Sequence, residues 1–104
     1  MKDISLVNEK KRDVVNSVCK IAENTSIVKR LIVFGSSVTK ECQNDSDIDI
    51  CFDITCDTKD LRLFNLRASI NQVCDYNCDF LVYSHIGNEL KNEIDEKGVV
   101  VYES

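Results

Sequence analysis

Apolar residues recur along the chain at two spacings, one typical of helices and one typical of strands. Between residues 6 and 23 they fall three or four positions apart, which predicts an amphipathic helix. The same spacing predicts a second helix that begins at Asp57 or Thr58 and a third that ends at Gly98. Continuous or alternating apolar residues predict strands over residues 31–34, 47–54, 78–83 and 99–102.

These elements follow one another in the order α-β-β-α-β-α-β, with a short helical turn expected after Gly35. Helices that alternate with strands pack on a sheet, so we expect an α/β (α+β) fold in which a small mixed β-sheet is packed with helices. The second helix is expected to bury one stripe of its surface, formed by Leu63, Leu66, Ile70 and Val73. A chain of 104 residues is the size of one domain, which we expect to span residues 1–104.

Composition excludes several classes of protein. The longest apolar run covers only residues 31–34, whereas a membrane-spanning helix needs about 20 apolar residues. No apolar stretch of signal-peptide length is present at the N-terminus, so we expect a cytoplasmic protein that does not enter a membrane. The six cysteines lack the paired spacing of a zinc site, and we expect reduced thiols that serve mostly as small core residues.

The net charge of −5 is concentrated in one stretch of the chain. Residues 41–60 contain seven acidic residues and one basic residue, a net charge of −6, so the rest of the chain has a net charge of +1. This distribution argues against stable nucleic-acid binding, which depends on Lys and Arg at phosphates. An acidic cluster of this kind is either a solvated surface or a site that holds a positive group.

Within the acidic stretch, the strand predicted over residues 47–54 places Asp47, Asp49 and Asp53 on one face. Carboxylates on alternate residues can converge on a pair of metal ions, and their hard oxygens suit Mg²⁺. The other interpretation is an edge strand whose polar face lies in water. Aspartate is disfavoured in strands, and like charges on one strand face repel each other. Both facts favour the metal site over a solvated face. Asp53 lies further along the strand, and a structural or solvated role is expected for it.

Two further features point to the same chemistry. Gly35 and Ser36 follow a buried strand directly, and a glycine there lets a phosphate approach the backbone. Asp79 interrupts the apolar strand predicted over residues 78–83, where it is either an ordinary strand-end residue or a third carboxylate of the site. Three carboxylates beside a phosphate-binding turn would form a two-metal phosphoryl- or nucleotidyl-transfer site.

The segment LIVFGSSVTKECQNDSDIDICF resembles the signature of the DNA polymerase beta-like nucleotidyltransferase superfamily: Gly-Ser, a spacer of about ten residues, then Asp-x-Asp. The chain is most similar to its minimal nucleotidyltransferase branch, from the leading helix to the ending GVVVYE. The resemblance implies that Gly35 and Ser36 hold the triphosphate and that Asp47 and Asp49 bind two Mg²⁺ ions. It implies that Asp79 completes the shell of the catalytic metal and helps to deprotonate the acceptor.

The resemblance also implies a partner and a reaction. Minimal members often pair with a helical HEPN-domain protein as toxin and antitoxin, and the small enzyme adds AMP from ATP to its partner with release of pyrophosphate. A chain that uses all its elements for one sheet is not expected to have a second domain that binds an antibiotic, a tRNA end or a DNA duplex, so we expect a partner chain to present the hydroxyl group.

The chain departs from the family pattern at Thr39 and Lys40, where the family usually has arginine and glycine. Lys40 is expected to offer its charge to the phosphates, as a point charge rather than a bidentate fork. The same departure supports the alternative function, a non-catalytic antitoxin or binding module that neutralises its partner by contact. A plain acidic domain with a solvated strand face is the third interpretation.

Overall fold

The computed structural model describes residues 4–42, 47–75 and 77–104, and its elements follow the predicted order. The helices are α1 (Arg12–Glu23), α2 (Leu61–Val73) and α3 (Asn88–Lys97). The strands are β1 (Val28–Phe34), β2 (Ile48–Ile54), β3 (Cys78–Val82) and β4 (Val99–Glu103). The described residues also form short 3-10 turns, which are η1 (Ile4–Leu6), η2 (Glu9–Lys11), η3 (Gly35–Val38) and η4 (Tyr83–His85).

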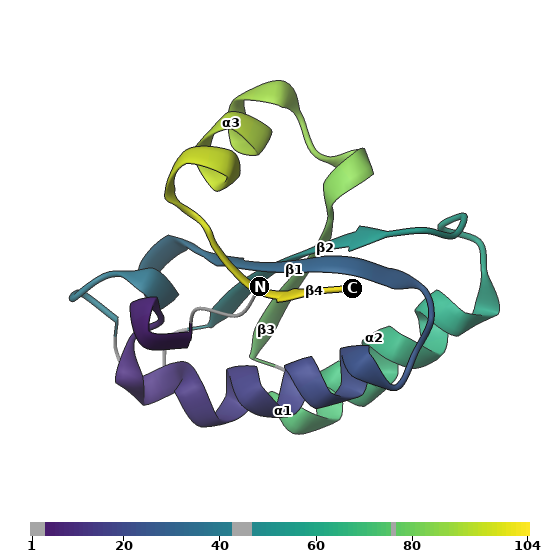
Figure 1. Cartoon of the computed structure of the whole chain (residues 1–104), viewed down its shortest axis with the longest axis horizontal. Helices are drawn as coiled ribbons and strands as arrows, with labels where there is room; N and C mark the ends of the chain where they lie inside the picture. Colours follow the sequence, from purple (N-terminus) through teal and green to yellow (C-terminus); the bar gives the residue numbers. More distant parts are fainter. Residues whose placement is uncertain (1–3, 43–46, 76) are drawn as a thin grey trace.

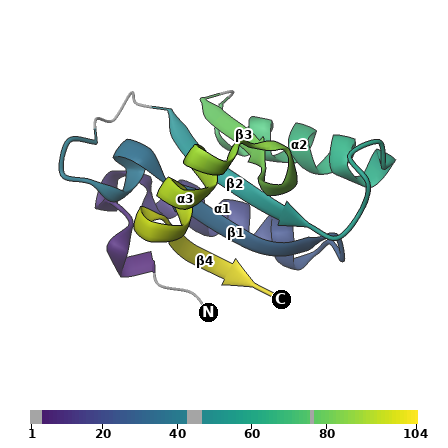
Figure 2. The same cartoon turned by 90° about the horizontal axis from the view of Figure 1, so that it is seen from above.

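The strands form one mixed sheet in the order β3-β2-β1-β4. β1 is antiparallel to both of its neighbours, β2 and β4, whereas β2 and β3 run parallel. α1 and α2 lie side by side on one face of the sheet, and α3 lies alone on the other (Figure 1). The view from above shows α3 crossing over the strands (Figure 2). The predicted α/β (α+β) fold with a small mixed sheet is therefore confirmed.

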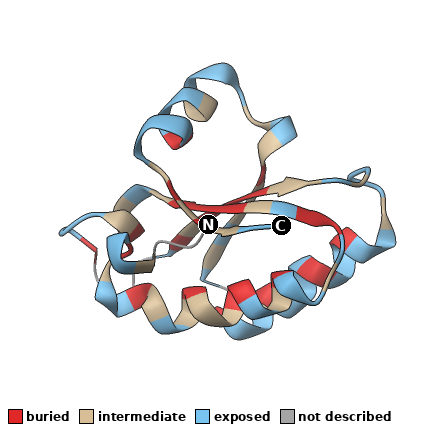
Figure 3. Ribbon diagram, in the orientation of Figure 1, coloured by how far each residue is buried: buried red, intermediate tan, exposed pale blue. Residues whose placement is uncertain are grey.

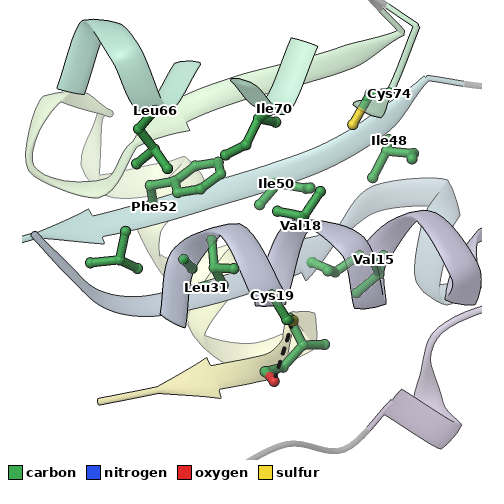
Figure 4. Packing of buried hydrophobic residues seen from close by; sticks show 14 of the residues in the cluster. Val15, Val18, Cys19, Leu31, Ile48, Ile50, Phe52, Leu66, Ile70 and Cys74 are labelled. Atoms are coloured by element: carbon green, nitrogen blue, oxygen red, sulfur yellow. Dashed lines mark hydrogen bonds between the residues drawn. The ribbon is translucent and has the colours of Figure 1, made fainter. Parts of the chain in front are cut away.

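The main hydrophobic core lies between the sheet and the pair α1 and α2, where buried positions of the helices face those of the strands (Figure 3). Phe52 on β2 is fully buried and stacks on Phe80 of β3, with ring centroids 3.9 Å apart. In the close view, apolar side chains of α1, α2 and β2 point toward one another (Figure 4). Cys19 of α1 also contacts β4, because its thiol donates a hydrogen bond to the carbonyl oxygen of Val101.

A smaller core joins α3 to the other face of the sheet. Ile94 of α3 packs against Ile32 of β1 and Cys51 of β2, and all three are buried. Gly98 ends the helix against the sheet, where a Cβ would collide with the carbonyl oxygen of Ile94 and the side chain of Ile32. These contacts fix the C-terminal end of α3 above β1.

The structure corrects several predicted boundaries and one buried position. α1 begins at Arg12 because 3-10 turns replace its first predicted part, and α2 begins after Asp60, whose carboxylate accepts a hydrogen bond from the backbone N–H of Arg62. Val73 is 37% exposed, so its prediction as a core residue is wrong. Cys74, one residue later, is buried in its place, because the stripe of α2 continues four residues after Ile70.

All six cysteines lie in described segments, and none of them forms a disulfide bond. Four of them are buried and two are partly buried, which agrees with their predicted role as small residues of the interior. Within residues 4–42, 47–75 and 77–104, we find no helix with the length and apolar character that a membrane span requires.

Candidate active site

Two acidic side chains meet at the start of the neighbouring parallel strands β2 and β3. The register places Asp49 beside Asp79, so both side chains project from the same face of the sheet. This is the face covered by α3, because Cys51 and Leu81, two residues further along the same strands, pack with that helix. The two carboxyl groups are close enough for Asp79 to disfavour the ionised form of Asp49. The structure thus brings Asp49 and Asp79 together, as the strand pattern predicts.

The environment of Asp49 disfavours its ionised form. Burial raises the pKa of Asp49 most, and the neighbouring carboxyl group of Asp79 raises it further. The charge of Asp47 adds to the effect, so that the pKa of Asp49 reaches about 6. Asp47, which lies just before β2, and Asp79 are both exposed. The site therefore concentrates negative charge at a point where Asp49 is only partly accessible to water.

Gly35 lies directly against Asp49, at the end of β1. Its φ of +66° is in the left-handed region that favours glycine. A Cβ at this position would collide with Oδ2 of Asp49, so the absence of a side chain allows backbone and carboxylate to approach each other. Gly35 begins the predicted short turn, η3, and Ser36 follows it as a half-buried residue.

The loop after η3 is held by the N-terminal 3-10 turns. The backbone N–H of Asn8 donates to the carbonyl oxygen of Ser37 at 2.8 Å, and its side-chain Nδ2 donates to that of Thr39, also at 2.8 Å. Lys10 extends this attachment, since its Nζ donates to the carbonyl oxygen of Cys42 at 3.1 Å. Asn8 is thus a residue of the site region that sequence reasoning missed, because hydrogen bonds to a distant backbone leave no pattern in the sequence.

A cavity of about 250 Å³ opens beside Gly35, between the loop and the C-terminal end of α3. It is lined by Phe34, Gly35, Val38, Thr39, Glu93 and Lys97. Lys40 does not line this cavity and faces a different, larger groove with Asn8 and Lys10. The predicted role of Lys40 at the phosphates remains a prediction. Lys97 was not predicted as a site residue, because a lysine in the last turn of a helix is explained by its interaction with the helix dipole.

The acidic residues present suit a magnesium ion by their chemistry. Asp47, Asp49 and Asp79 offer hard carboxylate oxygens, and the crowding of charge around Asp49 is of the kind that a cation relieves. Among the described residues, no three His, Cys, Asp or Glu side chains are grouped as a complete metal site. Mg²⁺ is commonly held by one or two carboxylates and completed by water and substrate phosphates, so the paired carboxylates fit it.

The other acid of the same strand face has a different environment. Asp53 forms a salt bridge with Arg30 of β1, with an N–O distance of 3.0 Å. The guanidinium of Arg30 also lies over the ring of Tyr83, 5.1 Å from its centroid. These contacts agree with the structural role expected for Asp53. His85, in η4, lines a separate cavity with Arg67 and Phe80 rather than the one beside Gly35.

Comparisons with known proteins agree with this architecture. A solved toxin–antitoxin complex with AMP-PNP has a chain that superimposes with a TM-score of 0.68 at 14% identity, over 93% of this chain and 75% of that chain. A chain of a solved MntA-HepT toxin–antitoxin complex superimposes with a TM-score of 0.65 at 16% identity, over 89% of this chain and 73% of that chain. A chain from the complex of a tri-AMPylated Shewanella oneidensis HEPN toxin with an MNT antitoxin has a TM-score of 0.67 at 17% identity, over 90% of this chain and 73% of that chain. At these identities the likeness shows the fold.

Sequence comparison adds the family. No curated protein matches the chain. Residues 16–104, which include every predicted site residue, match the family described as polymerase beta, nucleotidyltransferase. The match covers most of the chain, and the chain therefore belongs to the polymerase beta nucleotidyltransferase family.

Proposed function

We propose that this chain is a Mg²⁺-dependent nucleotidyltransferase that transfers AMP from ATP to a hydroxyl group on a partner protein. One observation carries the proposal: in a member of this family, Asp49 lies beside Asp79 in the register of two parallel strands and directly against the glycine that begins the Gly-Ser turn. A solvated strand face does not by itself explain why two carboxyl groups lie side by side and why the pKa of one of them is raised.

Each residue of the site has a distinct role in this proposal. Asp47, Asp49 and Asp79 would hold Mg²⁺, which supplies charge stabilisation for the transferring phosphoryl group. Gly35 leaves room for a phosphate beside the backbone, and Ser36 offers its backbone N–H and hydroxyl group to the phosphate oxygens.

The chemical step is an in-line displacement at the α-phosphorus of ATP. The acceptor oxygen forms a bond to the α-phosphorus, while the bond from that phosphorus to the oxygen bridging to the β-phosphate breaks and pyrophosphate leaves with its electron pair. The acceptor proton passes to the carboxylate of Asp79. Asp79 is exposed, so a hydroxyl group on another macromolecule can reach it.

The proposed partner is a helical protein of the HEPN type, and the proposed biological role is that of the antitoxin in a toxin–antitoxin pair. Support comes from structural neighbours of this chain, which are an MNT antitoxin bound to a tri-AMPylated HEPN toxin and a toxin–antitoxin complex with AMP-PNP. ATP is proposed as the nucleotide on the same basis.

A coupled assay tests the reaction. The purified chain is mixed with its proposed HEPN-type partner, and pyrophosphate release is measured with MgATP, with ATP and a chelator, and without the partner. We expect release only when partner and Mg²⁺ are both present, together with addition of one or more AMP groups to the partner by mass spectrometry. Absence of release from a mixture that forms a complex would contradict the proposed reaction.

That same outcome would favour a second candidate function, a non-catalytic antitoxin that neutralises its partner by contact. The observation behind it is the loop after η3, where Thr39 and Lys40 replace the arginine and glycine of the family pattern. Lys40 does not line the cavity beside Gly35 and instead lines a groove shared with the N-terminal turns.

A further inference from the structure

The cavity beside Gly35 is bounded on one side by a helix that belongs to a different part of the chain. Both cartoon views place the C-terminal end of α3 over the end of the sheet where η3 begins (Figures 1 and 2). Ile94 is buried against Ile32, and Gly98 follows in close contact with the same side chain. Lys97 lies between these two anchored residues, so its backbone is fixed where its side chain lines the cavity.

The electrostatic environment of this cavity favours a positively charged side chain beside a bound phosphate. A triphosphate in this cavity would lie near the negative end of the α3 dipole, and Gly35, which lines the cavity, is in contact with Asp49. Thr39 supplies no charge where the family pattern has arginine. Lys97 is the basic residue in the lining of the cavity, and Glu93, one turn earlier on α3, is the acidic one.

Two other basic side chains, on η2 and on α3, have partners elsewhere. Lys10 donates to the carbonyl oxygen of Cys42, and Lys91 lies 5.2 Å from the ring centroid of Tyr83. Lys97, by contrast, is exposed and takes part in no hydrogen bond, ion pair or ring contact within the described residues. Its ammonium group is therefore available for a ligand.

We propose that Lys97 binds phosphate oxygens of the nucleoside triphosphate and supplies the positive charge that the loop itself lacks. This inference rests on the proposed function, because it assigns a further residue to the same nucleotide site. It differs from the prediction for Lys40, since the cavity beside Gly35 is lined by Lys97 and not by Lys40.

A structural explanation for Lys97 makes different predictions. A lysine in the last turn of a helix stabilises the helix dipole, whatever lies nearby. The chain contains a matched case, because Lys20 occupies the last turn of α1 and is also exposed. Lys20 does not line the cavity beside Gly35, so its substitution reports the helix-end effect alone.

The test compares Lys97→Met, Lys97→Arg, Lys40→Met and Lys20→Met by isothermal titration with MgATP and with inorganic tripolyphosphate, alongside thermal unfolding. We expect Lys97→Met to raise the Kd for both ligands about tenfold to a hundredfold, the range for loss of a hydrogen bond to a charged group. Lys97→Arg should restore the Kd to within a few-fold of wild type, and Lys20→Met should leave it unchanged. Lys97→Met and Lys20→Met should show the same small change in Tm.

The inference is overturned if Lys97→Met binds MgATP as tightly as Lys20→Met does, or if Lys40→Met alone weakens binding. It is also overturned if the wild-type protein binds neither ligand. The proposed function fails separately: a wild-type protein that binds MgATP through Lys97 but never transfers AMP would contradict the reaction and leave the phosphate contact intact.

Discussion

The carboxyl group of Asp49 lies between two other acids and directly against the backbone of Gly35. Its pKa of about 6 is above the usual range of an aspartic acid in an unfolded chain. Between these two pKa values the folded protein binds more protons than the unfolded protein, so this group makes the free energy of unfolding decrease as pH rises. Its stabilising contribution is fully present below the unfolded pKa and is lost as pH rises through about 6.

Asp49→Asn removes this dependence. In metal-free buffer we expect the variant to be more stable than the wild type at about pH 7.5, where Asp49 is ionised, and the difference to shrink at about pH 5. Denaturant unfolding at both pH values measures it. Asp53→Asn is the control, because the partner of that carboxylate is Arg30 and not another acid. A stability difference between Asp49→Asn and wild type that is the same at both pH values would contradict the assignment.

Gly35 offers a second test at the residue scale. In Gly35→Ala the new Cβ meets Oδ2 of Asp49 in a left-handed backbone conformation, so we expect a loss of about 1–2 kcal/mol of stability from the backbone alone. Displacement of Asp49 should also reduce AMP transfer. Gly87→Ala is the matched control, since nothing lies within 4 Å of its Cβ position. Equal effects of the two substitutions on stability and transfer would show that Gly35 has no special role.

At the scale of elements, the attachment of the loop to the N-terminal turns is testable through Asn8. Asn8→Ala removes the hydrogen bond from Nδ2 to Thr39 and the cap of η2, in which Oδ1 accepts from the N–H of Lys10. We expect the free energy of unfolding to fall by about 1 kcal/mol. We also expect faster hydrogen exchange at the amide of Thr39, which donates a hydrogen bond to the carbonyl oxygen of Ser36.

Asn24→Ala serves as the control for Asn8, because the Asn24 side chain also donates to a backbone carbonyl, that of Lys20, but far from the loop in sequence. It should leave exchange at Thr39 unchanged. Protection of Thr39 that survives in Asn8→Ala would mean that the loop keeps its path without this attachment.

The order of elements was predictable from sequence because it depends on local patterns, whereas the meeting of Asp49 with Asp79 depends also on which strands pair. Apolar runs that stop at Gly35 or alternate through residues 48–54 define strands, and a motif at the start of each strand brings its side chains to one end of the sheet. The family resemblance supplied the pairing of these motifs.

Other features depended on packing that no local pattern specifies. Val73 and Cys74 are both apolar neighbours at the end of α2, and only the rotation of the helix against the sheet decides that Cys74 is buried. The position of Lys97 likewise follows from how Ile94 and Gly98 seat α3 on β1. Long-range contacts of this kind determine which cation reaches the cavity.

At the scale of the whole molecule, the two faces of the sheet differ in what they carry. α1 and α2 cover one face with the main core, while the face under α3 has a smaller core and leaves the start of β2 and β3 accessible (Figures 1 and 3). Asp47 and Asp79 are exposed at that end of the sheet. Substitutions at the carboxylates should therefore alter the chemistry of the site without altering the main core.

The central claim is that the acidic pair performs nucleotidyl transfer, and its most direct test is transfer of labelled AMP to the HEPN-type partner by wild type, Asp49→Asn and Asp53→Asn. Complex formation is followed in parallel by size exclusion. We expect the wild type to label the partner and Asp49→Asn to bind it normally but label it about a hundredfold or more slowly, the scale of losing one preorganised charge contact. Asp53→Asn, on the same strand face but paired with Arg30, should label at close to the wild-type rate. Undiminished labelling by Asp49→Asn, or a wild type that binds its partner and never labels it, would contradict the account.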